Sequence, residues 1–214
     1  EEIWASDVAP HILIWPESAE RAREIWRMVG VGSETYPGVR VLDVACGSGV
    51  NGFVLAQDDR KARITSLDLN PKVLDVAARV AEVMGVAKQV TFRRADVLSG
   101  DLGREEYDVV LFGRILYYFQ PDQVAAILRR AHEALKPEGL LVISSYIADD
   151  QRCKAESALL VAFQLLIFAP WSKVYTFAEY KEMLEAEGFA DVRQHGDGLI
   201  AARKGGPAAT ANKS

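Results

Sequence analysis

Cysteine and histidine are scarce in this chain of 214 residues, which holds two cysteines and three histidines. Cys46 and Cys153 lie far apart and match no metal-binding spacing, so we expect no metal site. So few cysteines also argue against a disulfide-stapled secreted domain and are typical of a reduced, cytoplasmic protein.

The chain also lacks a block of basic residues and an apolar run of membrane length. Its net charge is −5, whereas a nucleic-acid ligand needs a concentrated basic surface. The longest apolar stretch, residues 158–170, is broken by Gln164 and is too short to cross a bilayer. We therefore expect neither a nucleic-acid partner nor a membrane span. The sequence begins with two glutamates instead of Met or a signal peptide, which is consistent with a chain trimmed from a longer protein.

What the chain does contain is an alternation of short apolar segments with helical ones. Asn70 and Pro71 supply an N-cap and a first turn for one predicted helix, and Pro121 begins another. Strands are predicted on both sides of these helices, at 40–45, 63–69, 90–96, 107–113 and 140–147. Strands separated by helices predict a doubly wound, parallel sheet.

The C-terminal part of the sequence predicts a helix followed by a hairpin. Thr176 and Glu179 form a capping box that begins the helix. Two further strands, at 191–196 and 199–204, flank a turn that contains Asp197-Gly198. With these strands the sheet has seven members, mostly parallel, and ends in a C-terminal antiparallel hairpin.

Three segments follow from this pattern. Residues 1–38 read as a helical N-terminal lead-in, which glycine and proline residues separate from the first strand. Residues 39–205 form the α/β domain. Residues 206–214 are small and polar, and we expect a disordered tail there.

The loop after the first strand predicts a nucleotide-type cofactor. Gly47, Gly49 and Gly52 form a G-x-G-x-x-G pattern at the carboxyl end of that strand, where doubly wound sheets bind their ligands. Asp68 ends the second strand, where a carboxylate can accept both hydroxyls of a ribose. At this point a nicotinamide dinucleotide and another adenosine-bearing cofactor fit equally well.

Three features favour the second type of cofactor. Asp43 adds negative charge beside the loop, which disfavours a pyrophosphate and favours a ligand that carries a sulfonium and an ammonium. Asp96 ends the third strand, where it can accept from an adenine amino group. The terminal helix and hairpin are not part of a dinucleotide-binding half.

With these motifs in this order, the sequence from Arg40 to Arg203 resembles the class I S-adenosylmethionine-dependent methyltransferases. The segments that carry the resemblance are VLDVACGSG, LDLNP, RADVL, VLFGRILYYF and LKPEGLLVIS, with Ala45 where the first glycine is common. The resemblance implies a Rossmann-like fold, S-adenosylmethionine as cofactor and S-adenosylhomocysteine as product. The cofactor-binding residues that it implies are Asp43, Ala45, Gly47, Gly49, Asp68, Leu69, Asp96, Val97 and Gly113.

Within this class, the sequence is most similar to the catalytic domain of small-molecule O-methyltransferases. That implies a small apolar or aromatic acceptor, most simply methylated at oxygen, with carbon and nitrogen still open. Many members carry an N-terminal winged-helix dimerisation domain, whereas here only the lead-in precedes the first strand. The apolar segment 158–168, Trp15 and Trp26 suggest surfaces that need a partner, so we expect a homodimer.

The sequence departs from its relatives at the catalytic base. Tyr117 stands where many of them have a histidine, and its ordinary pKa near 10 makes it a poor base. Tyr117 and Arg114 are the catalytic candidates. Tyr117 is either a hydroxyl that orients the cofactor or the substrate, or a catalytic one. Arg114 either orients an anionic group of the substrate or has a surface or capping role. The three histidines offer little replacement: His132 reads as solvated and His195 as remote. His11 lies in the lead-in and could cover the pocket only if that segment folds over it. Two alternatives stay open, a nicotinamide-dependent oxidoreductase and an inactive cofactor-binding domain.

Overall fold

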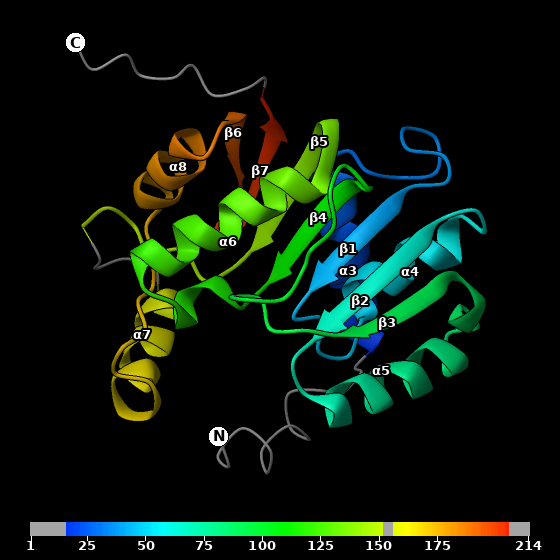
Figure 1. Ribbon diagram of the computed structural model, residues 1–214. Coiled ribbons are helices and arrows are strands. Elements are labelled where there is room, and N and C mark those ends of the chain that lie inside the picture. Colours follow the sequence, from blue (N-terminus) through cyan, green and yellow to red (C-terminus); the bar gives the residue numbers. More distant parts are fainter. Residues whose placement is uncertain (1–15, 152–155, 206–214) are drawn as a thin grey trace.

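The computed structural model describes residues 16–151 and 156–205, and in them a single sheet of seven strands runs in the order β3-β2-β1-β4-β5-β7-β6 (Figure 1). The first five strands are parallel, and β7 and β6 complete the sheet as an antiparallel hairpin beside β5. The strands are β1 (Arg40–Val44), β2 (Arg63–Asp68), β3 (Val90–Arg94), β4 (Tyr107–Gly113), β5 (Leu135–Ser144), β6 (Phe189–His195) and β7 (Leu199–Lys204). The predicted doubly wound sheet and its hairpin are confirmed.

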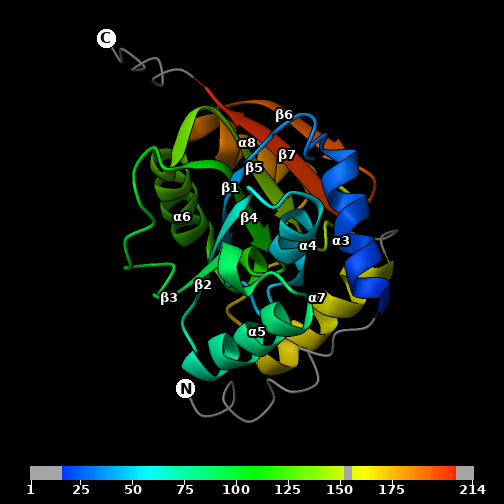
Figure 2. The same cartoon turned by 90° about the vertical axis from the view of Figure 1, so that its right-hand side faces the viewer.

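Helices cover both faces of the sheet (Figures 1 and 2). One face carries α3, α4 and α5, the other carries α6 and α8, and α7 lies beyond the carboxyl ends of the strands. No helix among the described residues combines the length and the apolar character needed to cross a membrane. The helices are α3 (Pro16–Met28), α4 (Val50–Asp58), α5 (Pro71–Val83), α6 (Pro121–Ala134), α7 (Glu156–Phe168) and α8 (Phe177–Ala186), with short 3₁₀ turns η1 (Ala87–Gln89) and η2 (Leu116–Tyr118).

Local sequence signals begin two of these helices as predicted. The side chain of Asn70 accepts from the backbone N–H of Lys72 at 3.0 Å, and Pro71 occupies the first turn of α5. Thr176 and Glu179 exchange both hydrogen bonds of a capping box at the start of α8. Each cap satisfies backbone N–H groups that have no partner within the helix.

Strand β5 begins earlier than the sequence predicted. Leu135 already pairs with Tyr107 of β4, directly after α6 ends, and the register then shifts before Val109 pairs with Leu140. The predicted start at residue 140 rested on Pro137 and Gly139, which interrupt the apolar pattern. Pairing with the neighbouring strand overrides that local signal.

The central strands are buried on both faces, as parallel strands covered by helices must be. In β1, Leu42 and Val44 pack in the core under α6, whereas Val41 packs in the core shared with α3, α4 and α5. Asp43 points to the same side as Val41 because side chains alternate along a strand. A carboxylate therefore lies inside an apolar layer.

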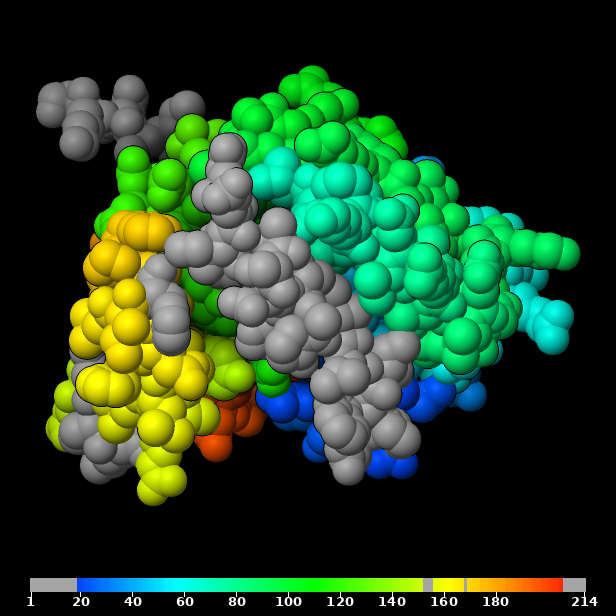
Figure 3. Space-filling model, turned by 90° about the horizontal axis from the view of Figure 1, so that it is seen from below, coloured from blue at the N-terminus to red at the C-terminus, as the bar shows by residue number. Residues whose placement is uncertain are grey.

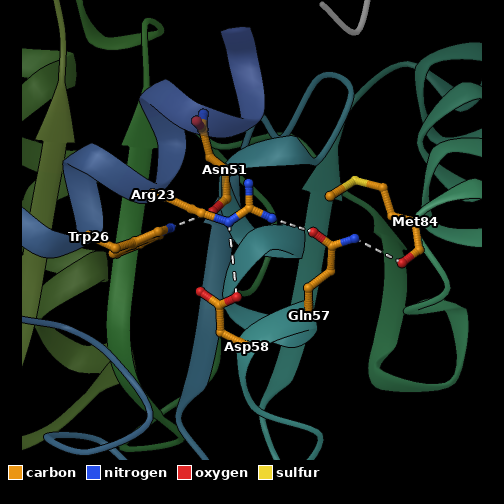
Figure 4. Close-up of polar contacts among 6 residues, drawn as sticks. All are labelled: Arg23, Trp26, Asn51, Gln57, Asp58 and Met84. Carbon is orange, nitrogen blue, oxygen red and sulfur yellow. Dashed lines mark hydrogen bonds and ion pairs between the residues drawn. The ribbon is translucent and has the colours of Figure 1, made fainter. Parts of the chain in front are cut away.

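Helix α3 is joined to α4 by side-chain contacts (Figure 4). The indole N–H of Trp26 donates to the backbone oxygen of Asn51 at 2.5 Å, and Arg23 donates to Gln57 at 2.8 Å. Trp26 is only 2% exposed, so the prediction that it forms part of a partner-seeking surface is wrong. The spacing of apolar residues in the sequence of α3 indicates that the helix has an apolar side, but it does not indicate that α4 covers that side. Trp15, the rest of 1–15 and the tail 206–214 lie outside the described residues.

Candidate functional site

The predicted site residues gather at the carboxyl edge of the sheet, which lies at the bottom of Figure 1. Figure 3 shows this edge, with α7 in yellow on one side and the green-cyan segment around α5 on the other. The loop from β1 into α4 turns through left-handed residues, with φ of 54° at Ala45, 56° at Gly47 and 76° at Gly49. A Cβ added to Gly49 would lie 2.2 Å from the ring of Phe53, whereas one added to Gly47 would meet open space. The loop therefore needs glycine at 49 for packing and presents bare backbone at 47.

Asp68 connects this loop to the end of β2. Its carboxylate accepts from the backbone N–H of Gly47 at 3.3 Å and from that of Asn70 at 3.0 Å. Burial raises the pKa of Asp68, and these two N–H groups oppose the rise. Leu69 follows with 59% of its surface exposed. An acceptor with spare lone pairs thus lies beside an open apolar side chain.

Asp96 lies at the neighbouring strand end. Its carboxylate accepts from the backbone N–H of Leu98 at 2.9 Å and from the hydroxyl of Ser99 at 3.2 Å. The N–H of Ala95 donates to the backbone oxygen of Asp68 at 3.1 Å, which joins the loops that follow β2 and β3. Val97 is buried beside Asp96. Asp68 and Asp96 therefore lie at the ends of two paired strands.

Asp43 lies beneath the same loop as an unpaired buried acid. It is 1% exposed, and among the described residues its Oδ2 has no hydrogen-bond partner. Ser66 pairs with it in register on β2, and the Ser66 hydroxyl is also buried without a partner. Burial raises the pKa of Asp43 well above its usual value; the backbone N–H of Gly52 opposes this and the charge of Asp68 adds to it. The pairing with Ser66 depends on strand register, which the sequence did not reveal.

The end of β4 lies close to the start of α4. A Cβ added to Gly113 would lie 3.1 Å from the amide nitrogen of Asn51. The backbone oxygen of Asn51 is the group that accepts from Trp26, so α3 helps to position this residue. Sequence reasoning did not select Asn51, although it stands inside the G-x-G-x-x-G pattern.

Beyond Gly113, three tyrosines form an aromatic cluster. The ring of Tyr117 lies 4.6 Å from that of Tyr118 and 5.9 Å from that of Tyr146. Burial, together with its hydroxyl neighbours, raises the pKa of Tyr117 well above its usual value. A tyrosine whose pKa is raised is ionised to an even smaller extent near neutral pH, so less of it is available to act as a base. Tyr146, which follows β5, was not selected from the sequence because only the pairing of β4 with β5 brings it here.

Arg114 lies beside this cluster. Its backbone has a φ of 55°, and its N–H donates to the oxygen of Ser144 at 2.7 Å. Its guanidinium lies over the ring of Tyr146, 5.1 Å from the centroid. The predicted pair Tyr117 and Arg114 therefore shares one surface, with Tyr146 between them.

His132 and His195 are not part of this surface. His132 packs edge-on against Phe189 at 5.1 Å, its Nε2 is buried, and burial lowers its pKa, so the prediction that it is solvated is wrong. Helix α6 turns this side chain inward, toward the hairpin. His195 ends β6, which is separated from β5 by β7. His11 lies outside the described residues.

A family profile described as a methyltransferase domain matches residues 36–188. The chain belongs to this methyltransferase family. The 8-O-methyl transferase TcmO of tetracenomycin polyketide synthesis from Streptomyces glaucescens is 33% identical over 131 residues, which are 61% of this chain and 38% of TcmO. The 3-hydroxy-5-methyl-1-naphthoate 3-O-methyltransferase of Streptomyces sahachiroi is 29% identical over 154 residues, which are 72% of this chain and 44% of that enzyme. The methyltransferase domain thus spans less than half the length of these relatives.

Solved structures agree with this assignment. The S-adenosylmethionine-dependent methyltransferase SibL superposes with a TM-score of 0.68 at 28% identity, over 78% of this chain and 51% of SibL. Human N-acetylserotonin methyltransferase in complex with S-adenosylmethionine gives a TM-score of 0.70 at 20% identity, over 89% of this chain and 56% of that one, and shows the shared fold. The predicted family, Rossmann-like fold and S-adenosylmethionine cofactor are confirmed, and these matches give no support to the nicotinamide alternative.

The side chains at the carboxyl edge fit this cofactor. The backbone at Gly47 is bare, and Asp68 lies beside exposed Leu69. Asp43 keeps one buried oxygen unpaired close to the loop. Together they offer hydrogen-bond acceptors, an apolar surface and negative charge, which suit a ribose, an adenine and a sulfonium respectively.

Proposed function

We propose that this chain is the catalytic domain of an enzyme that transfers a methyl group from S-adenosylmethionine to a small aromatic or apolar acceptor, at oxygen. One juxtaposition carries the proposal: the loop and carboxylates that suit the cofactor lie next to an aromatic cluster at the end of β4. A donor and an aromatic acceptor bound at these two places would be neighbours. Cofactor binding without turnover of any acceptor would instead favour the inactive-domain alternative.

In this proposal each cofactor residue has a role set by its chemistry. Asp68 accepts from the ribose hydroxyls, and Asp96 accepts from the adenine amino group. Leu69 and Val97 contact the adenine ring. Asp43 supplies negative charge toward the sulfonium and the ammonium. Ala45, Gly47, Gly49 and Gly113 contribute backbone rather than side chains.

The transfer itself needs little acid–base chemistry from the protein. When bound, S-adenosylmethionine supplies a methyl group activated by a sulfonium. Holding an acceptor in line with such a methyl group can lower the barrier by about 7–11 kcal/mol. Tyr117 is buried and its pKa is raised, so we assign to it a positioning role and not that of a base.

Carbon is a second candidate for the methylated atom. The L-tyrosine C(3)-methyltransferase of Streptomyces lavendulae is 26% identical to this chain over 154 residues. An ionised phenol is nucleophilic at oxygen and at the neighbouring ring carbon, and neither route requires a histidine in this chain. Mass spectrometry and NMR of the methylated product distinguish an ether from a ring-methylated phenol.

Calorimetric titration with S-adenosylhomocysteine tests the cofactor assignment. The change Asp68→Ala removes hydrogen bonds to a charged acceptor, which are worth about 1.5–3 kcal/mol, or roughly a ten- to a hundredfold weaker affinity. Asp75→Ala on the exposed side of α5 is the matched control and should bind as the parent does. Unchanged affinity in a folded Asp68→Ala variant, or tighter binding of a nicotinamide dinucleotide, would contradict the assignment.

We also propose that two copies of the chain pair through α7. The side chains that α7 and the segment after it expose are large and apolar: Leu159, Leu160, Phe163, Leu166, Ile167 and Trp171. Leu160, Phe163 and Ile167 recur at helical spacing and so share one side of the helix. An apolar surface of this kind supports a protein partner, and a second copy is the simplest one.

A further inference from the structure

The guanidinium of Arg114 has no carboxylate partner in the part of the chain that the structure describes. Within residues 16–151 and 156–205 the structure gives it no ion pair, and its recorded contact is with the ring of Tyr146. Arg129, by contrast, binds Glu187 through two hydrogen bonds of 2.8 and 2.9 Å. Arginine stays protonated in proteins, so Arg114 brings a positive charge that no carboxylate of the described residues pairs with.

The backbone holds Arg114 at the edge between β4 and β5. Its backbone is left-handed, with a φ of 55°, a conformation that arginine rarely adopts. The hydrogen bond to Ser144 ties it to the end of β5, and the N–H of Ser145 is in turn bonded to Gly198 of the hairpin at 2.8 Å. Three neighbouring segments thus hold the residue in place.

The surroundings of this charge are aromatic, and helix α7 packs against one side of them. The ring of Tyr117 contacts those of Tyr118 and Tyr146 in tilted geometry, with centroid distances of 4.6 and 5.9 Å. Ala158 and Leu165 of α7 pack against the cluster, and both are buried. An aromatic compound can stack against such a surface, and an anionic one can also reach the guanidinium.

Among the described residues, the site shows no group that is suited to removing a proton from a neutral phenol. The pKa of Tyr117 and that of Tyr118 are both raised, first by burial. His132 packs against Phe189, away from the cluster, and His195 lies on β6. The charge of Arg114 does favour a phenolate here, since it acts to lower the pKa of the Tyr117 phenol.

We propose that Arg114 makes a catalytic base unnecessary because it binds the acceptor as an anion. The acceptor is an aromatic hydroxyl compound that is ionised in the complex. Its oxygen lies at the guanidinium and its ring lies against Tyr146. This proposal rests on the proposed methyl transfer. The phenol loses its proton to water on binding. The phenolate oxygen then forms a bond to the methyl carbon while the carbon–sulfur bond breaks, and the electron pair of that bond stays on sulfur. Acidic phenols are therefore the preferred acceptors.

The experiment uses 4-nitrophenol as a probe, because its phenolate absorbs visible light and its neutral form does not. The parent is saturated with S-adenosylhomocysteine, and the absorbance of bound 4-nitrophenol is followed as the pH changes. An opposite charge within reach lowers a pKa by about one to three units. We expect a shift of that size for the bound probe in the parent, and no shift in Arg114→Gln.

Two further variants separate charge from geometry and from general effects. Arg114→Lys keeps the charge but not the planar contact with Tyr146, so part of the shift should remain. Arg104→Gln makes the matched change at an exposed position before β4, at the other end of that strand, and should behave as the parent does.

The outcomes distinguish this inference from the proposed function. Loss of S-adenosylhomocysteine binding in the parent would count against the methyltransferase assignment itself. If S-adenosylhomocysteine binds but 4-nitrophenol does not, or if its pKa is unshifted, the anionic acceptor site is overturned. An equal shift in the parent and in Arg114→Gln overturns it as well. Equal S-adenosylhomocysteine affinity in these two proteins verifies that the variant is folded.

Discussion

The unpaired Oδ2 of the buried Asp43 carboxylate should lower the stability of the cofactor-free protein. This oxygen is buried without a partner among the described residues, and the nearby Asp68 adds a second negative charge. A buried polar group without a partner costs about 1–3 kcal/mol, and more when it is charged. Replacing Asp43 by Asn removes the charge and offers an N–H to the unpaired hydroxyl of Ser66.

We therefore predict that Asp43→Asn is the more stable protein near neutral pH. A gain of about 1–3 kcal/mol corresponds to a rise in Tm of roughly 2–4 °C for each kcal/mol in a chain of this size. The same change should weaken binding of S-adenosylmethionine, because the proposed role of Asp43 is electrostatic. A substitution that raises the stability of the protein and lowers its affinity for the cofactor indicates that the original residue is retained for binding.

The difference between the two proteins should depend on pH. The pKa of Asp43 is raised in the folded state. The contribution of protonated Asp43 to the free energy of unfolding is therefore fully present below the pKa of the unfolded state, and it is lost as the pH rises through the pKa of the folded state. Asn lacks this contribution, so the advantage of the variant should be largest in alkali and should shrink as the pH falls. The contribution of Asp68 has the same sign and is present in both proteins, so it largely cancels in the difference.

Urea unfolding without cofactor, followed by circular dichroism across a range of pH, measures this difference. Asp75→Asn provides the matched control, since it makes the same chemical change on an exposed side of α5. A variant no more stable than the parent in alkali, or an advantage that stays constant with pH, would refute the reasoning about an ionised, unpaired Asp43.

Two further predictions concern the loop and the assembly. Gly49→Ala places a Cβ 2.2 Å from the ring of Phe53 at a φ of 76°, so we expect destabilisation of about 2–4 kcal/mol from overpacking and strain together; an unchanged urea midpoint would contradict this. Light scattering should find the parent as a dimer and Phe163→Lys as a folded monomer, because α7 exposes that ring. A monomeric parent at high concentration would refute pairing through α7.

Much of the fold follows from short-range signals in the sequence. The caps at Asn70 and Thr176 need only residues within one turn of each helix, and both hold in the structure. Strands were recognised from runs of apolar residues, since a parallel sheet buries both faces of its central strands. The order of the motifs was enough to predict the cofactor class, because each motif ends a different strand of one parallel sheet and parallel strands end at one edge.

The tertiary structure alone decided which side chains meet. Whether the apolar side of α3 is covered could not be known from its pattern, and α4 covers Trp26. The pairing of Asp43 with Ser66 depends on the register between β1 and β2. Tyr146 reaches Arg114 because β5 lies beside β4. Periodicity in a sequence reports the buried side of each element, whereas contacts between elements depend on register and on strand order, which involve residues far apart in the chain.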